Sequence, residues 1–149
     1  MTSDPAFMRY QDEHQRGCLD LFDGNCPRYF APQERADYLQ FLHNTRDPYW
    51  VSIQDNVIVA AFGLSRTADD CARLSWILVS PTHQQQGIGT VMMTFVLKQA
   101  KTLAVREIKI AASQHSAPFF ARFGAIEEAH TPHGWGPNMH RVDMRLALD

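Results

Sequence analysis

Hydrophobic and polar positions along this chain fall into blocks that switch between the period of a strand and that of a helix. Apolar residues recur at helical spacing in 33–43, whereas they alternate with polar residues in 140–148. The pattern predicts, in order, a strand over 6–10, helices over 11–22 and 33–43, strands over 49–53, 57–64 and 71–79, a helix over 91–101, a strand over 107–112, a helix over 116–123, and strands over 125–129 and 140–148.

Turn signals indicate how these segments are connected. Asp55-Asn56 favours a two-residue hairpin turn, and 67–70 is a second turn, so the three strands that end at residue 79 are predicted to be antiparallel neighbours. The next helix is long enough for a crossover, which should place strand 107–112 parallel to strand 71–79 or splayed from it. Glycines and prolines in 131–138 predict a loop.

The most informative stretch joins the strand that ends at Val79 to the following helix. Pro81 has no N–H for a strand ladder, and a polar run over 84–86 then leads to Gly87 and Gly89. The first N–H groups of a helix have no partner within the helix and lie at the positive end of its dipole. Glycines let a ligand approach such a backbone closely, so the stretch predicts a site for a phosphate or pyrophosphate.

Two familiar phosphate loops do not fit these residues. A dinucleotide site requires Gly or Ala three residues after the second glycine of the G-x-G pair, and here Met92 stands there. A nucleotide-binding P-loop requires a Gly-Lys pair, and the sequence contains none. The remaining alternative is an ordinary strand–turn–helix in which the glycines serve only the turn.

Two motifs carry a resemblance to a known family. Val79-x-Pro81-x-x-Gln84-x-x-Gly87-x-Gly89 resembles motif A of the GNAT acetyltransferases (Gcn5-related N-acetyltransferases), whose loop holds the pyrophosphate of coenzyme A. A second pattern is similar to motif B of that family, and it reads Ser113-x-x-Ser116-x-x-Phe119-Phe120-x-x-Phe123-Gly124-Ala125. The resemblance has motif support over 49–148, whereas the first 45 residues match only in the order of their elements.

The resemblance implies a fold and an activity. The expected fold is of the α/β (α+β) class: a mixed, mostly antiparallel sheet of six or seven strands flanked by about four helices, in the order βααβββαβαββ, as a single domain over 1–149. The expected activity is direct transfer of an acetyl group from acetyl-CoA to a primary amine. Residues expected to bind the co-substrate are Leu78 and Val79 along its pantetheine arm, Gln84, Gln85, Gln86, Gly87, Ile88, Gly89 and Thr90 around its pyrophosphate, and Ser113 and Phe120 of motif B.

The catalytic residues stay open because the sequence departs from the family pattern. Phe120 stands where many members have a tyrosine that protonates the leaving thiolate. The thiolate then leaves unaided, or Ser116 donates the proton, or the protein binds acyl-CoA without transferring it well. Strand 71–79 contains no glutamate to serve as the base, and Asp69 and Asp70 fit an exposed turn. The candidates for acid or base are Ser116, His115, His133 and His140, with His83 a candidate contact to CoA.

The acceptor site is expected to come from the first two predicted helices and the loop near 131–139. Its candidate walls are aromatic residues that could equally pack in the core: Tyr29, Phe30, Trp50, Trp76 and Trp135. A small-molecule amine, an aminoglycoside, an amino acid or a peptide could all be the acceptor. His130, His133 and His140 have an unspecific spacing for metal ligands, and we predict no metal.

Composition limits the class of protein. The chain has 149 residues and a formal net charge of -2, which suits one domain and provides no basic footprint for nucleic acid. No apolar run approaches the roughly 20 residues of a membrane span, and the first residues do not resemble a signal peptide, so we expect a cytoplasmic protein. Its three cysteines are then expected to be free thiols.

Two other kinds of protein share these features. One is a non-catalytic sensor that binds acyl-CoA, and the other is an interaction protein that pairs through its terminal strand and has no affinity for CoA. Dimers are frequent in the GNAT family, so a homodimer is among the expected assemblies.

Overall fold

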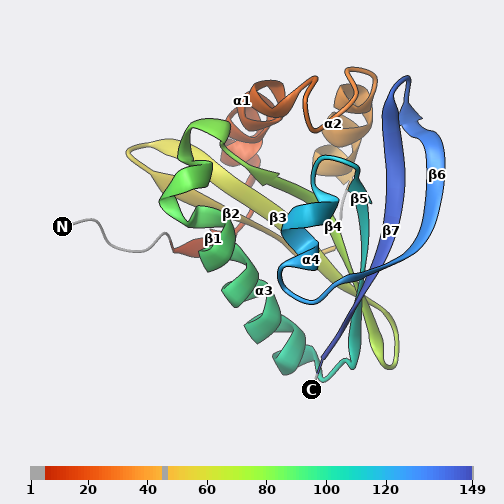
Figure 1. Ribbon diagram of the computed structural model, residues 1–149. Helices are drawn as coiled ribbons and strands as arrows, with labels where there is room; N and C mark the ends of the chain where they lie inside the picture. Colours follow the sequence, from red (N-terminus) through yellow and green to blue (C-terminus); the bar gives the residue numbers. More distant parts are fainter. Residues whose placement is uncertain (1–5, 45–46, 149) are drawn as a thin grey trace.

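The computed structural model describes residues 6–44 and 47–148, with only the backbone described for 84–86. Its elements are β1 (Phe7–Arg9), α1 (Gln15–Asn25), α2 (Glu34–Asn44), β2 (Tyr49–Gln54), β3 (Val57–Ala68), β4 (Cys71–Val79), α3 (Ile88–Leu103), β5 (Glu107–Ser113), α4 (Ala117–Ala121), β6 (Ile126–Gly136) and β7 (Met139–Ala147). Short 3-10 helices precede α1 (Asp12–His14) and α3 (Pro81–Gln86). The predicted order of strands and helices is confirmed (Figure 1).

The seven strands of the described chain form one mixed sheet in the order β1-β2-β3-β4-β5-β7-β6. Only β4 and β5 are parallel among these neighbours, because the crossover through α3 returns the chain in the same direction. Asp55 and Asn56 have φ angles of 53° and 65°, as a tight hairpin turn between β2 and β3 requires. The predicted fold class is therefore confirmed.

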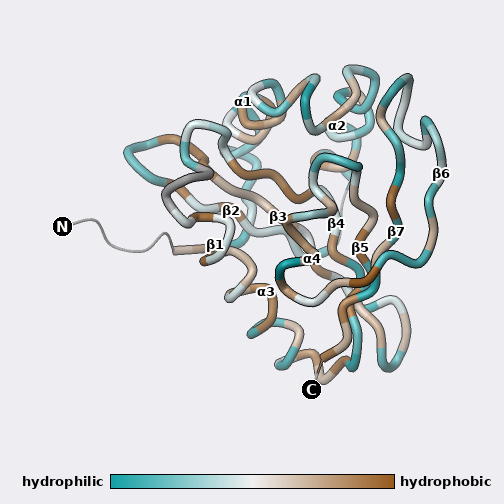
Figure 2. Tube along the Cα trace, viewed as in Figure 1, coloured by the Kyte–Doolittle hydropathy of each residue, from teal (hydrophilic) through white to brown (hydrophobic). Residues whose placement is uncertain are grey.

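Helices cover both faces of the sheet (Figure 1). On one face, α1 and α2 bury Phe22 and Tyr38 against Leu78 and neighbouring strand residues. On the other face, α3 and α4 pack over a larger apolar cluster that includes Val96 and Ile108. Figure 2 shows hydrophobic residues concentrated along the central strands and hydrophilic residues at the hairpin turns and along the outer parts of α1 and α2. The core thus consists of two layers separated by the sheet.

A bulge in β4 interrupts this sheet near its centre. The pairing of β3 with β4 shifts in register between Ala61 and Gly63, so that Trp76 and Ile77 together face one residue of β3. Trp76 has a φ of 47°, which is unusual for a bulky residue. The pairing of β4 with β5 covers only Cys71–Leu74, and the two strands diverge beyond it. The two arrangements expected for these strands therefore both occur: β4 and β5 are parallel as far as Leu74 and splayed beyond it.

The segment predicted as a loop over 131–138 is instead the end of β6 and its turn, so this prediction is wrong. β6 continues to Gly136 and pairs with β7, and the chain turns at Pro137 and Asn138. Gly134 explains the difference, because a Cβ added there would lie 2.5 Å from the Cβ of Arg141 on the partner strand. The glycine permits a close approach of two strands.

Several element boundaries also differ from the prediction, among them the start of α1, both ends of α3 and of α4, and the ends of α1 and β3. α1 continues through Gly24 to Asn25, and β3 continues to Ala68, because both extensions are held by packing or pairing rather than by local propensity.

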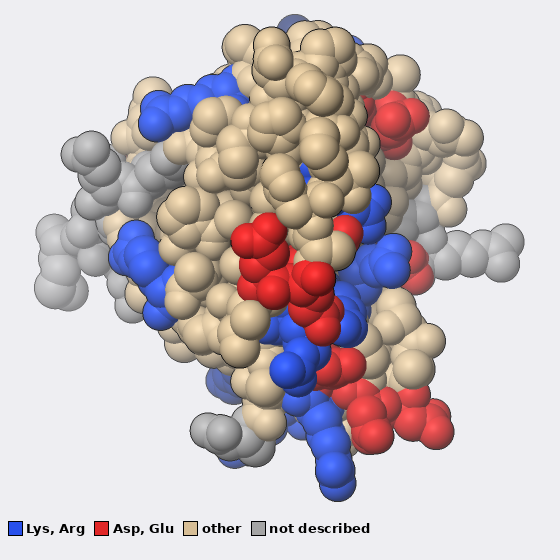
Figure 3. All heavy atoms as spheres, turned by 45° about the vertical axis from the view of Figure 1, so that its right-hand side comes forward, with Lys and Arg blue, Asp and Glu red and all other residues tan. Residues whose placement is uncertain are grey.

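At the β5–β7–β6 side of the sheet, ion pairs join Lys109 to Glu128 and Arg145 to Glu107 and Glu128. Figure 3 shows acidic and basic side chains interleaved on this side. No helix in the described part of the chain is both long and apolar enough to cross a membrane.

Candidate active site

A cavity of about 570 Å³ lies where β4 and β5 diverge. One end, called the α3 end below, is lined by Val79 and by residues of α3 and α4, among them Gly89, Thr90, Met92, Phe119 and Phe120. The opposite end, called the aromatic end, is lined by Tyr29, Phe30, Glu34, Trp76 and Trp135. Because α3 and α4 cover one face of the sheet and α1 and α2 the other, the cavity passes through the gap between the two strands.

At the α3 end, the two glycines of the predicted phosphate loop have different roles. Gly87 has a φ of 79° and precedes α3, and no described atom outside its chain neighbours lies within 4 Å of where its Cβ would be. A Cβ on Gly89 would lie 3.0 Å from the ring of Phe119. Gly87 therefore provides a left-handed conformation, whereas Gly89 lets α3 pack closely against α4.

The other residues predicted to bind the co-substrate occupy several environments. Val79, Thr90, Ser113 and Phe120 line the cavity with Gly89. The side chains of Leu78 and Ile88 are buried in the two core clusters, so these residues can face a ligand only through their backbone. The backbone of Gln84, Gln85 and Gln86 forms the 3-10 helix before Gly87.

Ser113 and Ser116 form the turn between β5 and α4 at the rim of the cavity. The Oγ of Ser116 accepts the N–H of Ser113 at 3.0 Å, and the Oγ of Ser113 accepts the N–H groups of His115 and Ser116 at 3.2 and 3.3 Å. Ser116 thus stands at the N-cap position of α4 but bonds back to β5. Its Oγ also lies 3.4 Å from the Oγ of Ser113, and either hydroxyl can be the donor in that bond.

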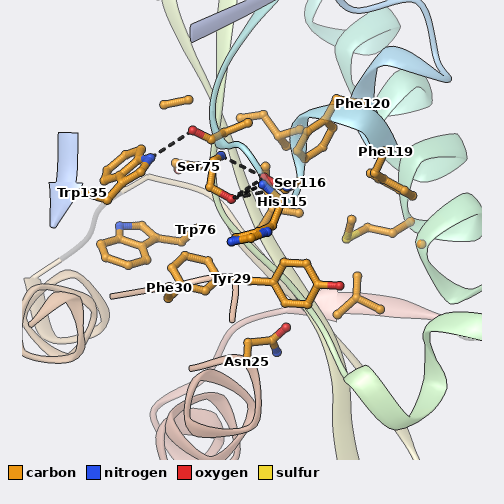
Figure 4. Close-up of a pocket in the computed structure, with 18 of the residues that line it drawn as sticks. Asn25, Tyr29, Phe30, Ser75, Trp76, His115, Ser116, Phe119, Phe120 and Trp135 are labelled. Atoms are coloured by element: carbon orange, nitrogen blue, oxygen red, sulfur yellow. Dashed lines mark hydrogen bonds between the residues drawn. The ribbon is translucent and has the colours of Figure 1, made fainter. Parts of the chain in front are cut away.

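The structure separates the candidate histidines. His115 lines the cavity, and its ring lies 6.4 Å from that of Tyr29 in an edge-on arrangement (Figure 4). His133 and His140 lie on the β6–β7 hairpin outside the cavity lining, where their Nδ1 atoms accept backbone N–H groups at 2.8 and 3.0 Å. His83 bonds to neighbouring hydroxyls before α3. Among the residues that the structure describes, no group of three or more His, Cys, Asp or Glu side chains is placed to hold a metal.

Four of the five candidate aromatic walls line the cavity. Trp50 is the exception, because it stacks on Phe62 in the core at 5.1 Å between ring centroids. Trp76 and Phe30 lie nearly parallel, with an interplanar angle of 14° (Figure 4). The indole N–H of Trp135 donates to the carbonyl of Ala112 at 2.9 Å, which fixes that ring at the aromatic end.

A buried chain of hydroxyl groups supports the bulge behind Trp76. The hydroxyl of Tyr49 donates to the carbonyl oxygen of Trp76 at 2.7 Å, and the hydroxyl of Tyr38 lies 2.8 Å from that of Tyr49. Because each hydroxyl has one proton, Tyr38 is the donor to Tyr49. Burial raises the pKa of both phenols, which keeps them protonated. The carbonyl oxygen of Trp76, which the bulge turns inward, therefore has a hydrogen-bond donor.

Glu34 is a cavity residue that the sequence did not point to. It begins α2 and is 6% exposed, and its Oε2 accepts the N–H of Ala31 at 2.8 Å. Burial raises the pKa of this carboxyl to about 7, against a smaller lowering by the bond from Ala31. A glutamate in the first turn of a predicted helix indicates a capping role. Its place in the cavity depends on how α2 packs on β4, which no local pattern contains.

The model described as the acetyltransferase (GNAT) family matches residues 16–125. No curated protein sequence matches the chain at a significant level.

Solved structures that share the fold include Ard1 and two proteins described as N-acetyltransferases. Ard1 from Thermoplasma volcanium has a TM-score of 0.81 at 12% identity, covering 99% of this chain and 99% of that chain. An aminoglycoside 6'-N-acetyltransferase complexed with coenzyme A has a TM-score of 0.75 at 11% identity, covering 95% and 96%. The ribosomal-protein-S18-alanine N-acetyltransferase from Escherichia coli has a TM-score of 0.76 at 15% identity, covering 96% and 93%. Such low identities show a shared fold alone.

The family match is broader than the motifs. Residues 16–125 include α1 and α2 as well as the glycine loop and the turn into α4, so the match extends into the region where the motifs offered no support. The chain belongs to the GNAT family of acetyltransferases.

Proposed function

We propose that this protein transfers an acetyl group from acetyl-CoA directly to a primary amine. The observation that carries the proposal is the cavity through the gap between β4 and β5, because it connects the start of α3 with the aromatic end. A thioester entering from the α3 end would meet an amine entering from the aromatic end inside the sheet. Such positioning of two reactants is itself a large part of catalysis.

The α3 end suits the pyrophosphate of coenzyme A. α3 is 16 residues long and has no acidic side chain in its first turn, so the positive end of its dipole is not compensated there. Gly87 adds backbone without a side chain at the same place. We assign the pyrophosphate to the backbone N–H groups of Gln84, Gln85, Gln86, Gly87, Ile88, Gly89 and Thr90.

The rest of the co-substrate would extend from the helix into the gap in the sheet. Beyond Leu74, β4 no longer pairs with β5. We place the pantetheine arm in this gap, alongside Leu78 and Val79, with its thioester near Ser113 and Phe120. The arm would then take the position that a neighbouring strand has elsewhere in the sheet.

The reaction requires two proton movements. The ammonium group must lose a proton before its nitrogen can attack the thioester carbonyl carbon. The C–N bond forms, the C–S bond breaks, and the CoA thiolate takes up a second proton from the same nitrogen. The balance is ammonium plus acetyl-CoA giving amide, CoA thiol and one proton released to water.

The residues that line the cavity support direct transfer of the acetyl group, but they do not identify the acid that protonates the leaving thiolate. Among the described residues that line the cavity there is no cysteine to carry an acetyl group, and burial raises the pKa of the Cys18 thiol to about 11. Phe120 lines the cavity and has no proton to donate, whereas the hydroxyl of Ser116 is at the rim. The thiolate therefore leaves unaided or with help from Ser116.

Thermal unfolding with acetyl-CoA tests the co-substrate, with NADH and ATP as controls. A ligand at about 100 times its dissociation constant stabilises by roughly 2.7 kcal/mol, which raises the Tm by several degrees. A shift with acetyl-CoA alone supports the proposal, and no shift would refute it. Thiol release from acetyl-CoA with a panel of amines then separates an enzyme from a non-catalytic sensor, because only the enzyme releases thiol in proportion to added amine.

A further inference from the structure

Resting on the proposed function, we propose that Glu34 is the catalytic base, whose carboxylate binds the ammonium group of the acceptor and takes its proton. The residue lies in the first turn of α2, more than 35 residues before β4, which contains no glutamate that could serve as the base.

Glu34 is placed where an acceptor amine would enter the cavity. Glu34 lines the aromatic end together with Phe30 and Trp76. It is the only carboxylate among the described residues that line the cavity. β4 contains no acidic residue from Cys71 to Val79, so no strand carboxylate competes for the role. A positively charged acceptor entering this end would meet Glu34 in surroundings where water is largely excluded.

Its hydrogen bonding leaves one side of the carboxylate available. Oε2 accepts the N–H of Ala31, and the N–H of Glu34 donates to the carbonyl of Ala31 at 2.9 Å. Within the described part of the chain, Oε1 makes no hydrogen bond. The pair of bonds holds the carboxylate in place, while Oε1 keeps lone pairs for an ammonium group.

The ionisation of Glu34 suits a base at neutral pH. Burial brings its pKa to about 7, so that it is substantially ionised at physiological pH and can still hold a proton. The charged or titratable groups near it are Asp37 on α2 and Cys26 after α1, and those on other walls of the cavity are Tyr29, His115, Arg73, Arg122 and Arg141. Asp37 adds to the raised pKa, and Arg141 is itself paired with Asp143 at 3.0 Å.

The walls near Glu34 also indicate the acceptor. Phe30, Trp76 and Trp135 line this end with aromatic rings, which favour a flat apolar body, and the ring of Trp135 already has the guanidinium of Arg141 over it at 5.1 Å. Arg73 and Arg122 line the same cavity and would repel a second ammonium group, whereas the charge of Arg141 is shared with Asp143. We infer that the acceptor has one ammonium group on an aromatic or similarly flat body, and 2-phenylethylamine is our probe, with spermidine as the polycationic comparison.

The test uses the full chain, Glu34→Gln and the matched control Asp37→Asn. Glutamine keeps an oxygen for the Ala31 N–H but cannot take a proton, and Asp37 is exposed one turn further along α2. Loss of a general base typically costs 10²–10⁴-fold, so we expect kcat of Glu34→Gln to fall by about 100-fold or more at pH 7.5. Asp37→Asn should stay within about twofold of the wild type.

The pH profile distinguishes a base from a structural residue. For the wild type, kcat/KM should rise to a plateau above about pH 7. For Glu34→Gln it should keep rising toward the pKa of the free amine, because only an amine that loses its proton unaided can then react. The Tm increase caused by acetyl-CoA should match that of the wild type, which shows that the α3 end is intact.

Results that contradict the role of Glu34, the acceptor class and the proposed function can be told apart. An acetylating wild type whose activity and pH profile are unchanged in Glu34→Gln would overturn the assignment of the base and leave the proposed function standing. A preference for spermidine over 2-phenylethylamine would overturn the acceptor class. No transfer by the wild type to any amine of the panel would overturn the proposed function together with the role of Glu34.

Discussion

The α3 end of the cavity comes from two short stretches of consecutive residues, 79–92 and 113–120, whereas the aromatic end is assembled from segments far apart in the chain. Gln33, in the turn before α2, for example, donates to the carbonyl of Trp135, which lies 102 residues away in the sequence. The first end uses backbone groups, which any sequence with suitable glycines can present. The second uses side chains, which must be brought together by packing. A local motif can therefore predict the α3 end, but it says little about the aromatic end.

The two ends also differ in the electrostatics of their polar groups. At the α3 end, unpaired backbone N–H groups at a helix start favour a negative ligand. At the aromatic end, a single carboxylate lies among aromatic rings and favours a positive one. If the ends are separate functional units, a change at one should leave the other's ligand unaffected. Variants that change one end at a time test that separation.

Glu34→Gln should change the pH dependence of stability most. The pKa of Glu34 is raised from 4.5 to about 7, so the folded state holds its proton more tightly than the unfolded state. Stability from this group is fully present below about pH 4.5 and is lost as pH rises through 7, by about 3 kcal/mol. Glutamine removes that loss, so the variant should be more stable than the wild type at pH 8.5 and similar at pH 4.5.

Urea unfolding at the two pH values measures this difference. Asp37→Asn is the control, because Asp37 is exposed and its charge should matter far less to the free energy of unfolding. An equal difference between wild type and Glu34→Gln at both pH values would show that Glu34 titrates normally in the folded protein.

Gly89→Val should damage the α3 end. The added methyl groups would collide with the ring of Phe119, since a Cβ alone would approach it to 3.0 Å. Overpacking of this kind costs about 2–3 kcal/mol, and displacement of α4 from α3 should reduce the Tm increase caused by acetyl-CoA.

Two further variants serve as controls for Gly89→Val. Thr90→Val introduces the same side chain at the next, exposed position and should be nearly neutral in stability. Phe119→Ala combined with Gly89→Val should recover part of the lost stability. Acetyl-CoA binding by Gly89→Val at wild-type strength would contradict a role for this close contact in shaping the α3 end.

Tyr49→Phe should loosen the bulge and so act on the aromatic end. Removal of the hydroxyl leaves the buried carbonyl of Trp76 without its donor, at a cost of about 1–2 kcal/mol. The KM for the amine should rise, while the KM for acetyl-CoA should not. Tyr38→Phe retains the bond from Tyr49 to Trp76 and is the matched control. A rise of both KM values in Tyr49→Phe would show that the bulge serves the two ends together.

Phe120→Tyr should have the smallest effect. If the thiolate leaves without help from the protein, a phenol at this position adds nothing, and kcat should stay within about threefold of the wild type. Steady-state kinetics with saturating acetyl-CoA measures it. A tenfold or larger gain would show that the native enzyme lacks an acid it could use, and Ser116→Ala would then reveal whether that residue supplies a partial substitute.

Much of the fold was predictable from local patterns. Asp55-Asn56 has the residue types of a tight turn, and its two positive φ angles are as expected. The 131–138 segment shows where this reasoning fails, since its glycines and prolines resemble a loop. There Gly134 serves the close approach of β6 and β7, a contact with Arg141 that depends on residues outside the segment.

The sequence by itself determined the order of elements, the glycine-containing start of α3 and the family, because periodicity and helix-terminal N–H groups are properties of neighbouring residues. Only the tertiary structure decided that β4 bulges at Trp76, that Tyr49 supports the bulge and that Glu34 faces the cavity. These features depend on side chains that meet from α1, α2, β2, β4 and β6. Burial then changes the chemistry of the groups it brings together, as the raised pKa of Glu34 illustrates.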